Sequence, residues 1–415
     1  MKPLIVSATD GLGGADRAAF RVLSALRKFD VDAEMLVLHK YTDCYYVNKP
    51  NSKIERLWTV LRNIMANRIQ NLQKTENKDL HSGNWFRSHL LKNINTFEVD
   101  LVNLHWCNAE TLSIKQIASI NKPIVMTLHD MWAFCGSEHY VVDSSIRFKE
   151  GYLKSNREQG EKGVDIDRKV WERKKKYWQI PFSIVTPSDW LSQCVSESNL
   201  FTGWPIFTIP NALDTTLYKP LDKNICREIL GLPKDILLIG FGAINTKDFR
   251  KGFDLLLDSL NHLSNSVNLL DIACVVVGQT EPKEKLKLNI PIHYMGRFYD
   301  DYTMALFYNA IDIMVVPSRQ ENLPQTATEA QACGTPVVAF NCTGLTSAIE
   351  HNKTGYLAKA YDSEDLAEGI RKILTDQDNY KLLQKNARER AVELWSQEVV
   401  SKQYIELYKK VLASS

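Results

Sequence analysis

Residues 311–340 read IDIMVVPSRQENLPQTATEAQACGTPVVAF, and this stretch decides the fold. An apolar, β-branched run at 311–318 predicts a strand, a helix is expected to start near Pro324, and a second strand follows at 336–340. Strands that are apolar on both faces and alternate with helices are typical of parallel sheets covered on both sides. The stretch therefore predicts one β-α-β unit of a doubly wound α/β fold.

The same unit recurs through the rest of the chain. Further runs that we interpret as strands stand at 3–8, 33–38, 99–105, 123–129, 183–188, 236–243, 272–278 and 291–296. Because 415 residues exceed what one core usually organises, we expect two Rossmann-like domains, 1–208 and 209–395, and a final helix over 396–415 that packs back on the first. Ligands of such sheets bind beyond the carboxyl ends of the strands, so two sheets facing each other predict a central cleft.

Composition and charge exclude several classes of protein. With 44% hydrophobic and 24% charged residues the chain is of the soluble globular type, and a net charge of +2 gives no global case for nucleic acid. The start MKPLIVSATDG reads as a strand and not as a signal peptide, and no run reaches the ~20 apolar residues of a membrane span. The eight cysteines lack zinc spacing, which favours reduced thiols in a cytoplasm.

The loop after the first strand, Asp10-Gly11-Leu12-Gly13-Gly14-Ala15, leads directly into a helical pattern. Gly13 and Gly14 would let the backbone approach an anion, and the helix N-terminus offers free N–H groups. The alternative is a tight strand-to-helix turn without a ligand, since the spacing is not GxGxxG.

Two glutamates flank the helix start in the opening stretch. Glu321 lies in the loop and Glu329 about one and a half turns into the helix, so the pair can hold hydroxyls at two ends of an extended ligand whose phosphates lie on the helix terminus. The residues expected at the phosphates are Asn322, Leu323, Pro324 and Gln325. The alternative is one solvated glutamate and one N-terminal helix charge.

Two further candidates follow strand ends. Arg250 and Lys251 come after the strand at 236–243 and would neutralise the charge of a departing diphosphate; a solvated surface pair is the alternative. His129 ends the strand at 123–129 and would face the cleft, although a lone histidine is more often structural.

The segment PSRQENLPQTATEAQACGTPVVAF resembles the signature of retaining glycosyltransferases of family 4, which have the two-domain fold called GT-B. The shared pattern is a Pro-Ser, a Glu, seven residues, a Glu-Ala and a Gly-x-Pro-Val-Val-Ala turn. It is matched by Pro317, Ser318, Glu321, Glu329, Ala330, Gly334, Pro336, Val337, Val338 and Ala339. Ordered similarities continue at GGADRAAFRV, VNLHW, TLHDMW, TPSDWL, IPNALD and HNKTGYLA.

The resemblance implies a role for each candidate. Glu321 would contact the donor sugar, Glu329 the ribose and Lys251 the diphosphate, while His129 would orient the donor without acting as an established base. The first domain would then be on the acceptor side, and the second would bind the nucleotide sugar.

Two departures from the family pattern matter. The family's usual arginine soon after the strand is missing, because this chain reads Gly242-Ala243-Ile244, so Arg250 is expected to supply the charge. Relatives with HDMW often carry a cysteine-rich stretch soon after it, whereas 142–167 has no cysteine and is interpreted as a polar, flexible loop. Asp165-Ile166-Asp167 in that loop resembles the Asp-x-Asp metal motif, but it lies away from a strand end and we expect no metal.

Two basic segments suggest contact with a membrane. In 53–74 the apolar residues Ile54, Leu57, Trp58, Leu61, Ile64, Met65, Ile69 and Leu72 fall on one helical face among Lys53, Arg56, Arg62, Arg68 and Lys74. Residues 168–178 carry six basic side chains against one acid. Anionic lipid or a lipid-diphosphate acceptor would suit both, and the alternative is a helix whose apolar side packs on the core.

These observations predict metal-independent transfer of a hexosyl group from a nucleotide-diphosphate sugar to a saccharide or lipid-linked saccharide, without a further cofactor or nucleic acid. The resemblance implies retention of configuration and a place in O-antigen, capsule or exopolysaccharide synthesis, at the inner face of the cytoplasmic membrane. The alternatives are a GT-B nucleotide-sugar epimerase, an inverting transferase and a non-catalytic sugar-nucleotide-binding protein. No motif indicates the donor base and sugar, the acceptor, the linkage or the oligomeric state.

Overall fold

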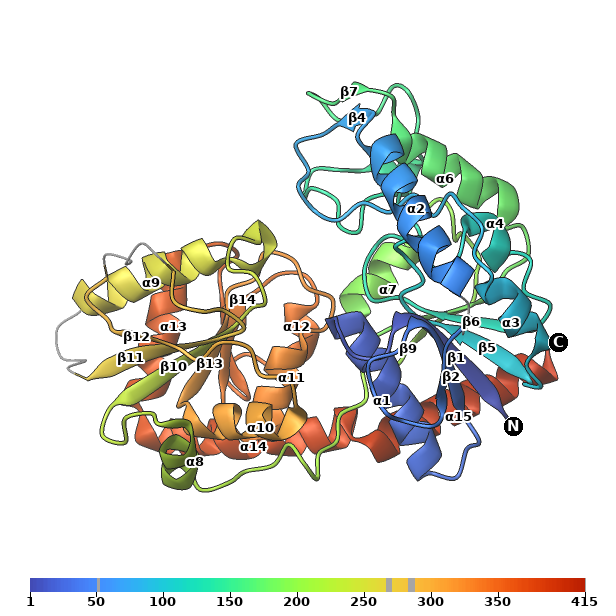
Figure 1. Cartoon of the computed structure of the whole chain (residues 1–415). Helices are drawn as coiled ribbons and strands as arrows, with labels where there is room; N and C mark the ends of the chain where they lie inside the picture. The colour runs from blue at the N-terminus through green and yellow to red at the C-terminus, as the bar shows by residue number, and fades with distance from the viewer. Residues whose placement is uncertain (51–52, 266–270, 283–287, 415) are drawn as a thin grey trace. The chain divides into compact units, whose positions relative to one another are not determined.

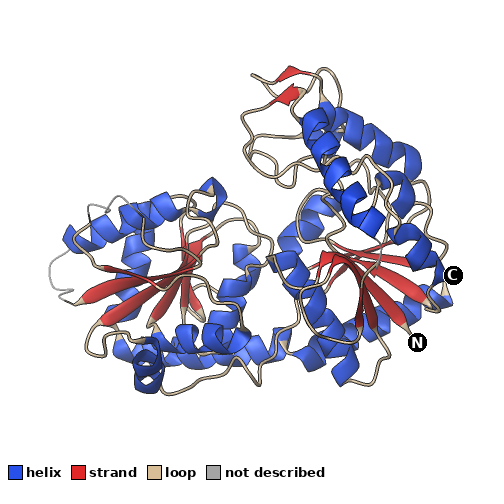
Figure 2. Ribbon diagram, viewed as in Figure 1, coloured by secondary structure: helices blue, strands red, loops and turns tan. Residues whose placement is uncertain are grey.

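The computed structural model describes residues 1–50, 53–265, 271–282 and 288–414. The chain divides into two compact units, Met1–Ala212 with Val400–Ser415, and Leu213–Val399. In each unit helices surround one large parallel sheet (Figure 1; Figure 2).

The first unit contains a seven-stranded parallel sheet in the order β3-β2-β1-β5-β6-β8-β9. Every residue of β1 is buried, as expected for a central strand covered on both faces. The elements are β1 (Pro3–Thr9), α1 (Gly14–Lys28), β2 (Glu34–His39), β3 (Val47–Asn48), α2 (Lys53–Gln70), β4 (Gln73–Lys74), α3 (Leu90–Thr96), β5 (Leu101–Leu104), α4 (Ile114–Ile117), β6 (Ile124–Thr127), α5 (Arg147–Glu150), β7 (Lys162–Gly163), α6 (Ile166–Tyr177), β8 (Ser183–Thr186), α7 (Asp189–Ser196) and β9 (Ile206–Thr208).

The second unit contains a six-stranded parallel sheet in the order β12-β11-β10-β13-β14-β15. Helices α9 and α13 pack together on one face, and α8, α10, α11 and α14 lie on the other (Figure 1). The elements are α8 (Lys223–Leu230), β10 (Leu237–Gly242), η1 (Phe249–Lys251), α9 (Phe253–Asn265), β11 (Ile272–Val277), β12 (Ile292–Tyr294), α10 (Asp301–Ala310), β13 (Ile313–Val316), α11 (Gln325–Ala332), β14 (Val337–Phe340), α12 (Leu345–Ala348), β15 (Gly355–Ala358), α13 (Ser363–Thr375) and α14 (Gln377–Trp395).

The last helix, α15 (Gln397–Ala413), returns to the first unit. Tyr404 and Tyr408 are buried in the core that also contains α1 residues. The Tyr408 hydroxyl accepts a hydrogen bond from Asn103 Nδ2 at 2.7 Å, and the Tyr404 hydroxyl lies 3.2 Å from Thr127 Oγ1. These contacts attach α15 to the ends of β5 and β6.

The predicted doubly wound fold is confirmed, and the strand order shows where each sheet can hold a ligand. The chain progresses outward in opposite directions from β1 and β5 in the first sheet, and from β10 and β13 in the second. Loops at such switch points diverge to opposite faces of the sheet and leave room for a ligand at the strand ends. Among the described residues, no helix is both long and apolar enough to cross a membrane.

Candidate active site

Three predicted site residues meet at the switch point of the second sheet. Arg250 and Lys251 lie in η1, which follows β10, and Glu321 lies in the loop between β13 and α11. Lys251 Nζ is 2.5 Å from Glu321 Oε1, and Arg250 Nη1 is 3.6 Å from Glu321 Oε2. Ser318 Oγ donates a further hydrogen bond to Glu321 Oε1 at 3.1 Å. One carboxylate therefore holds both cations beside the carboxyl end of the sheet.

The cations decide the ionisation of Glu321. Burial raises the pKa of this carboxyl, but Lys251 and Arg250 lower it by more, so that its pKa lies below the ordinary value. Glu321 is consequently an anion at neutral pH, and it holds the Lys251 side chain at the loop between β13 and α11.

Two glycines let the backbone loops of this site meet. Gly252 has φ +65°, and a Cβ there would lie 1.8 Å from the carbonyl oxygen of Pro317. A Cβ on Gly344 would lie 1.4 Å from the carbonyl oxygen of Asn322. No side chain fits at either contact. The loops after β10, β13 and β14 are thus packed backbone against backbone around Glu321.

The loop after β14 contributes residues that the sequence analysis missed. Gly344 N donates to the Glu321 carbonyl at 2.9 Å, and Glu321 N donates to Thr343 Oγ1 at 3.2 Å. Arg250 and Lys251 were selected by the strand-end rule, which treats residues that follow the carboxyl end of a strand as candidate ligand contacts. Thr343 and Gly344 also follow a predicted strand, so the same rule would have found them.

The start of α11 differs by one residue from the prediction. Pro324 is the N-cap with φ −67° and ψ 120°, and Gln325 is the first helical residue. Pro324 makes no side-chain capping hydrogen bond. Asn322 and Leu323, which lead into this helix, are buried. The first N–H groups of α11 lie next to the Glu321 loop, where a helix terminus favours an anion.

Glu329 does not join this cluster. It is 2% exposed, and its Oε2 accepts a hydrogen bond from the Tyr308 hydroxyl of α10 at 2.8 Å. Tyr308 therefore orients Glu329, which the sequence analysis did not foresee because the two residues lie on different helices.

In the first unit, His129 is paired with a second histidine. His105 Nδ1 lies 2.9 Å from His129 Nε2, and the two rings stack with centroids 5.2 Å apart. Burial lowers the pKa of His129 to about 4 and also lowers that of His105, so both rings are neutral at pH 7. His105 follows β5 directly and was missed, although it ends a predicted strand just as His129 does.

The pair has a defined proton arrangement. His105 Nε2 is buried without a hydrogen-bond partner among the described residues. A buried N–H without a partner costs more than a lone pair, so these contacts favour the tautomer in which His105 Nδ1 donates to His129 Nε2. In that tautomer His129 carries its own proton on Nδ1 and can donate one hydrogen bond to a ligand.

The glycine loop after β1 is held from two sides. Asp16, in the first turn of α1, accepts from Ser7 Oγ at 2.8 Å and from Thr9 Oγ1 at 2.7 Å. Asp10 accepts from the backbone N–H groups of Tyr41 at 2.7 Å and Thr42 at 3.0 Å. Gly13 is the N-cap of α1 with φ −113°, a conformation open to any residue. The fold does not require glycine at position 13, because an added Cβ would meet only Asp16 Oδ2 at 3.5 Å.

The predicted site residues thus fall into three groups. Arg250, Lys251 and Glu321 meet in the second unit, with the start of α11 beside them and Glu329 held separately by Tyr308. The remaining predicted residues, His129, Gly13 and Gly14, belong to the first unit.

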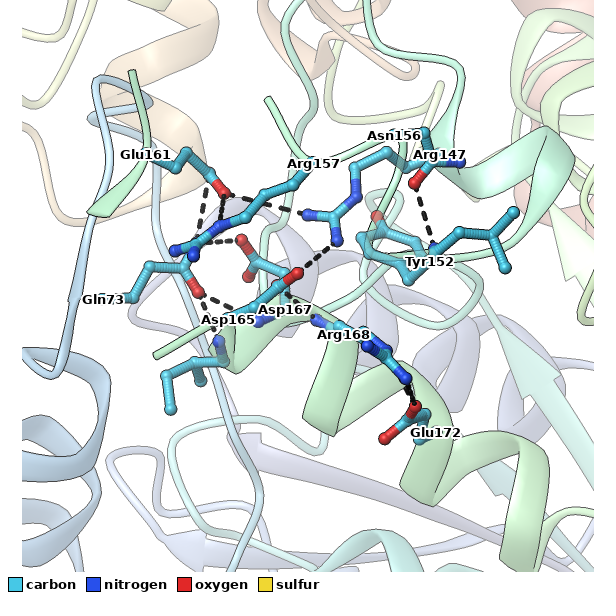
Figure 3. A network of polar contacts seen from close by, with 12 residues as sticks. Gln73, Arg147, Tyr152, Asn156, Arg157, Glu161, Asp165, Asp167, Arg168 and Glu172 are labelled. Carbon is cyan, nitrogen blue, oxygen red and sulfur yellow. Dashed lines mark hydrogen bonds and ion pairs between the residues drawn. The ribbon is translucent and has the colours of Figure 1, made fainter. Parts of the chain in front are cut away.

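The Asp-x-Asp motif belongs to a polar junction in the first unit (Figure 3). Glu161, Asp165 and Asp167 bring carboxylate oxygens within 4.8 Å of one another. Asp165 caps α6 by accepting from Arg168 N at 2.9 Å, and it pairs with Arg147 Nη2 at 2.7 Å. Asp167 accepts from Ser137 and Gln73, and Glu161 accepts from Arg157 Nε at 3.3 Å. These carboxylates are therefore used by internal donors, and the absence of a metal requirement remains a prediction.

Residues 142–167, predicted to be a polar, flexible loop, are not loop throughout. The segment contains α5 and β7, and β7 pairs with β4. Arg147, Phe148 and Tyr152 are buried. Ion pairs and aromatic contacts hold the segment, and such contacts have no periodicity that a sequence pattern can reveal.

Two Rossmann-like units, each built on a parallel sheet, are typical of the GT-B class of fold. Solved structures confirm this. Sucrose-phosphate synthase from Thermosynechococcus elongatus superimposes with a TM-score of 0.66 at 18% identity, covering 100% of both chains. HepE of Anabaena in complex with UDP-glucose gives a TM-score of 0.64 at 17% identity, covering 99% of this chain and 100% of that one.

Residues 224–390, which lie within the second unit, match the family model described as Glycosyl transferases group 1. D-inositol 3-phosphate glycosyltransferase 1 of Catenulispora acidiphila is 31% identical over 210 residues, or 47% of this chain and 49% of that protein. N,N'-diacetylbacillosaminyl-diphospho-undecaprenol alpha-1,3-N-acetylgalactosaminyltransferase of Campylobacter jejuni is 34% identical over 121 residues, or 29% of this chain and 31% of that protein. The chain thus spans half or less of the length of these curated relatives.

Proposed function

We propose that this protein is a glycosyltransferase that moves a hexosyl group from a nucleotide-diphosphate sugar to a saccharide or lipid-linked saccharide. The observation that carries the proposal is the cluster of Arg250, Lys251 and Glu321 at the switch point of the second sheet, beside the start of α11. The family match of residues 224–390 and the UDP-glucose complex of a protein with the same fold support a donor of this chemistry.

In the proposed reaction the bond between the anomeric carbon and the diphosphate oxygen breaks, and its electron pair stays on that oxygen. Lys251, Arg250 and the first N–H groups of α11 neutralise this developing charge, so that the proposal needs no metal ion. The acceptor oxygen forms the new bond to that carbon, and its proton passes to the departing diphosphate oxygen. Catalysis then consists of positioning and leaving-group stabilisation.

The remaining predicted residues position the donor in this proposal. Glu321 accepts hydrogen bonds from the sugar, and Glu329, oriented by Tyr308, accepts them from the ribose. His129 offers its Nδ1–H as a neutral donor to the ligand. The Gly13-Gly14 loop approaches the phosphates in this proposal. Such a role would explain the glycine at position 13, because the fold itself leaves room for a Cβ there.

We also propose that the transfer retains the anomeric configuration of the sugar and that it serves surface-polysaccharide synthesis. The name of the Campylobacter jejuni relative describes transfer to a saccharide on diphospho-undecaprenol, which supports a lipid-linked acceptor. The cytoplasmic face of a membrane is the location that we propose for this acceptor.

Thermal unfolding with a panel of UDP-, GDP-, ADP- and TDP-sugars tests the donor site. A donor at about 100 times its Kd stabilises the site by about 2.7 kcal/mol, which raises the Tm of a domain of this size by about 5–10 °C. We expect a shift with one nucleotide only, reduced in Lys251→Ala and Glu329→Ala. The absence of a shift with every nucleotide would overturn the donor assignment.

The anomeric configuration of the product, determined by NMR spectroscopy, distinguishes the enzymatic alternatives. Retention supports the proposal, whereas inversion or epimerised free sugar identifies one of the alternative GT-B activities. Donor-dependent stabilisation without any cleavage of the donor would instead identify a binding protein.

A further inference from the structure

Helix α2 exposes four of its apolar side chains and buries three of its polar ones. Leu57, Val60, Leu61 and Ile64 are 64%, 56%, 44% and 45% exposed, and their spacing places them in one stripe along the helix. On the opposite side Glu55, Thr59 and Arg62 are 3% or less exposed. Both interpretations of the 53–74 segment predicted an amphipathic helix, and the structure decides which side faces the protein. Residues 53, 54 and 56 of the predicted face lie outside the described side chains.

The inward side of α2 is fixed by polar contacts. Arg62 Nη1 pairs with Glu55 Oε1 at 3.0 Å, and Arg62 Nη2 donates to Thr59 Oγ1 at 2.9 Å. The carbonyl oxygen of Arg87 accepts from Trp58 Nε1 at 2.8 Å and from Arg62 Nη1 at 3.3 Å. Turning the helix to bury its leucines would break both hydrogen bonds to the Arg87 carbonyl and expose the Glu55–Arg62 pair. The exposure of the apolar stripe is therefore built into the fold.

The charges along the stripe have one sign. Among the described side chains from Leu57 to Lys74, the exposed charged ones are Arg68 and Lys74, and the only acid of the helix, Glu55, is buried with Arg62. Arg68 follows Ile64 by one helical turn and continues the stripe. Leu72, which is 55% exposed, extends the apolar surface past the end of the helix. An aliphatic stripe that ends in cations matches the boundary between acyl chains and anionic headgroups.

The second basic segment, residues 168–178, does not present all of its cations on the surface. Lys174 is buried and donates to the carbonyl oxygens of Cys135 at 3.0 Å and Gly136 at 2.7 Å, and Arg173 donates to that of Gly83 at 2.9 Å. Burial lowers the pKa of Lys174 to about 7. Two of the six basic residues of 168–178 therefore hold the loops that precede them, while contact of this segment with a membrane stays a prediction.

We propose that α2 docks the protein on an anionic membrane surface, with Leu57, Val60, Leu61 and Ile64 inserted at the boundary of headgroups and acyl chains and Arg68 and Lys74 on the lipid phosphates. The helix lies in the plane of the interface and does not cross it. If the proposed function holds, this contact brings the protein to lipid-linked acceptors, but the docking itself does not depend on that function.

Flotation of the full chain with vesicles tests the proposal. The vesicles are phosphatidylcholine alone, or phosphatidylcholine with about a third phosphatidylglycerol, at low and at high salt. We expect binding to the anionic vesicles and a decrease with salt. Leu57→Gln/Leu61→Gln should lower the partition coefficient at least tenfold, and Arg68→Gln should lower it about fivefold.

A matched control is available on α8, where Ile225 and Ile229 have the same spacing and are 59% and 61% exposed. Ile225→Gln/Ile229→Gln should leave vesicle binding unchanged. Calorimetric donor binding, measured on the same samples, should be unchanged in all of these variants, so failure to dock and failure to bind a donor are separate results.

Three outcomes would overturn the docking role of α2. These are no vesicle binding by the unmodified chain, binding that survives Leu57→Gln/Leu61→Gln, or a dimer in sedimentation analysis that the same double substitution dissociates. The last outcome would assign the stripe to contact with a second copy of the chain.

Discussion

Replacing Lys251 by methionine removes one charge from the centre of the candidate site and keeps most of the side chain. The variant loses the contact of 2.5 Å between Lys251 Nζ and Glu321 Oε1, while Arg250 remains at 3.6 Å. A hydrogen bond to a charged group contributes about 1.5–3 kcal/mol, and Arg250 offsets part of its loss, so we expect the second unit to lose about 1–2 kcal/mol of stability. Its Tm should fall by about 2–8 °C.

The stability lost in Lys251→Met should depend on pH in a defined direction. Because the pKa of Glu321 lies below its ordinary value, its ionised form stabilises the folded state above the unfolded pKa, about 4.3, and this stabilisation disappears as the pH falls through the folded pKa. In Lys251→Met the burial of Glu321 is less compensated, its pKa rises, and its charge becomes unfavourable at neutral pH. The stability gap between the two proteins should be widest near pH 7 and should narrow toward pH 4.

Donor binding should weaken in the same variant. A lost charge-assisted contact with the diphosphate, at about 1.5–3 kcal/mol, corresponds to an increase in Kd of about 10- to 100-fold. Titration calorimetry measures this Kd, and urea unfolding at pH 4 and pH 7 measures the stability. Lys247→Met is the matched control, because Lys247 lies four residues away and is exposed. An unchanged Kd in Lys251→Met, or an equal increase in Lys247→Met, would refute the role given to Lys251.

Three further predictions concern backbone and histidine positions. Gly252→Ala should destabilise the second unit by more than about 2 kcal/mol, since a Cβ would lie 1.8 Å from the carbonyl oxygen of Pro317, and a normal Tm would contradict the packing described. Gly13→Ala should change the Tm little, because its Cβ would meet only Asp16 Oδ2 at 3.5 Å, yet it should slow donor cleavage at least tenfold. An unchanged rate would leave Gly13 as an ordinary turn residue. Burial lowers the pKa of His129 from 6.5 to about 4. The unfolded chain therefore takes up this proton at a higher pH than the folded chain does, and the free energy of unfolding falls as the pH drops from 6.5 to about 4. In His129→Gln, urea unfolding should show that the slope of this free energy against pH is smaller by about 1.4 kcal/mol per pH unit.

The sequence predicts best those features that repeat along the chain. Alternating apolar runs and helices indicated both sheets, because strands buried on two faces leave a continuous pattern. The strand-end rule selected Lys251 and Glu321 independently, and the structure places their side chains in contact. The same rule applied one strand earlier would have found His105.

Features that depend on tertiary polar contacts could not be predicted in this way. Periodicity placed the apolar residues of 53–74 on one helical face, but the hydrogen bonds of Trp58 and Arg62 to the Arg87 carbonyl hold the opposite side against the protein. The position of Glu329 against Tyr308 joins two helices, and a local pattern contains no information on that distance. Arg147 likewise packs the 142–167 segment by pairing with Asp165 across a stretch that reads as polar.

Cleavage of the donor tests the central claim most directly, because it needs no identified acceptor. The full chain is incubated with the nucleotide sugar that stabilises it, and release of the nucleoside diphosphate is followed with and without a lipid extract that supplies acceptors. The account predicts slow release alone, faster release with transfer of the sugar to an extract component, and at least a 100-fold loss in Glu321→Gln with donor binding retained. Tight binding of the donor without cleavage under either condition would contradict it and would identify a sugar-nucleotide-binding protein.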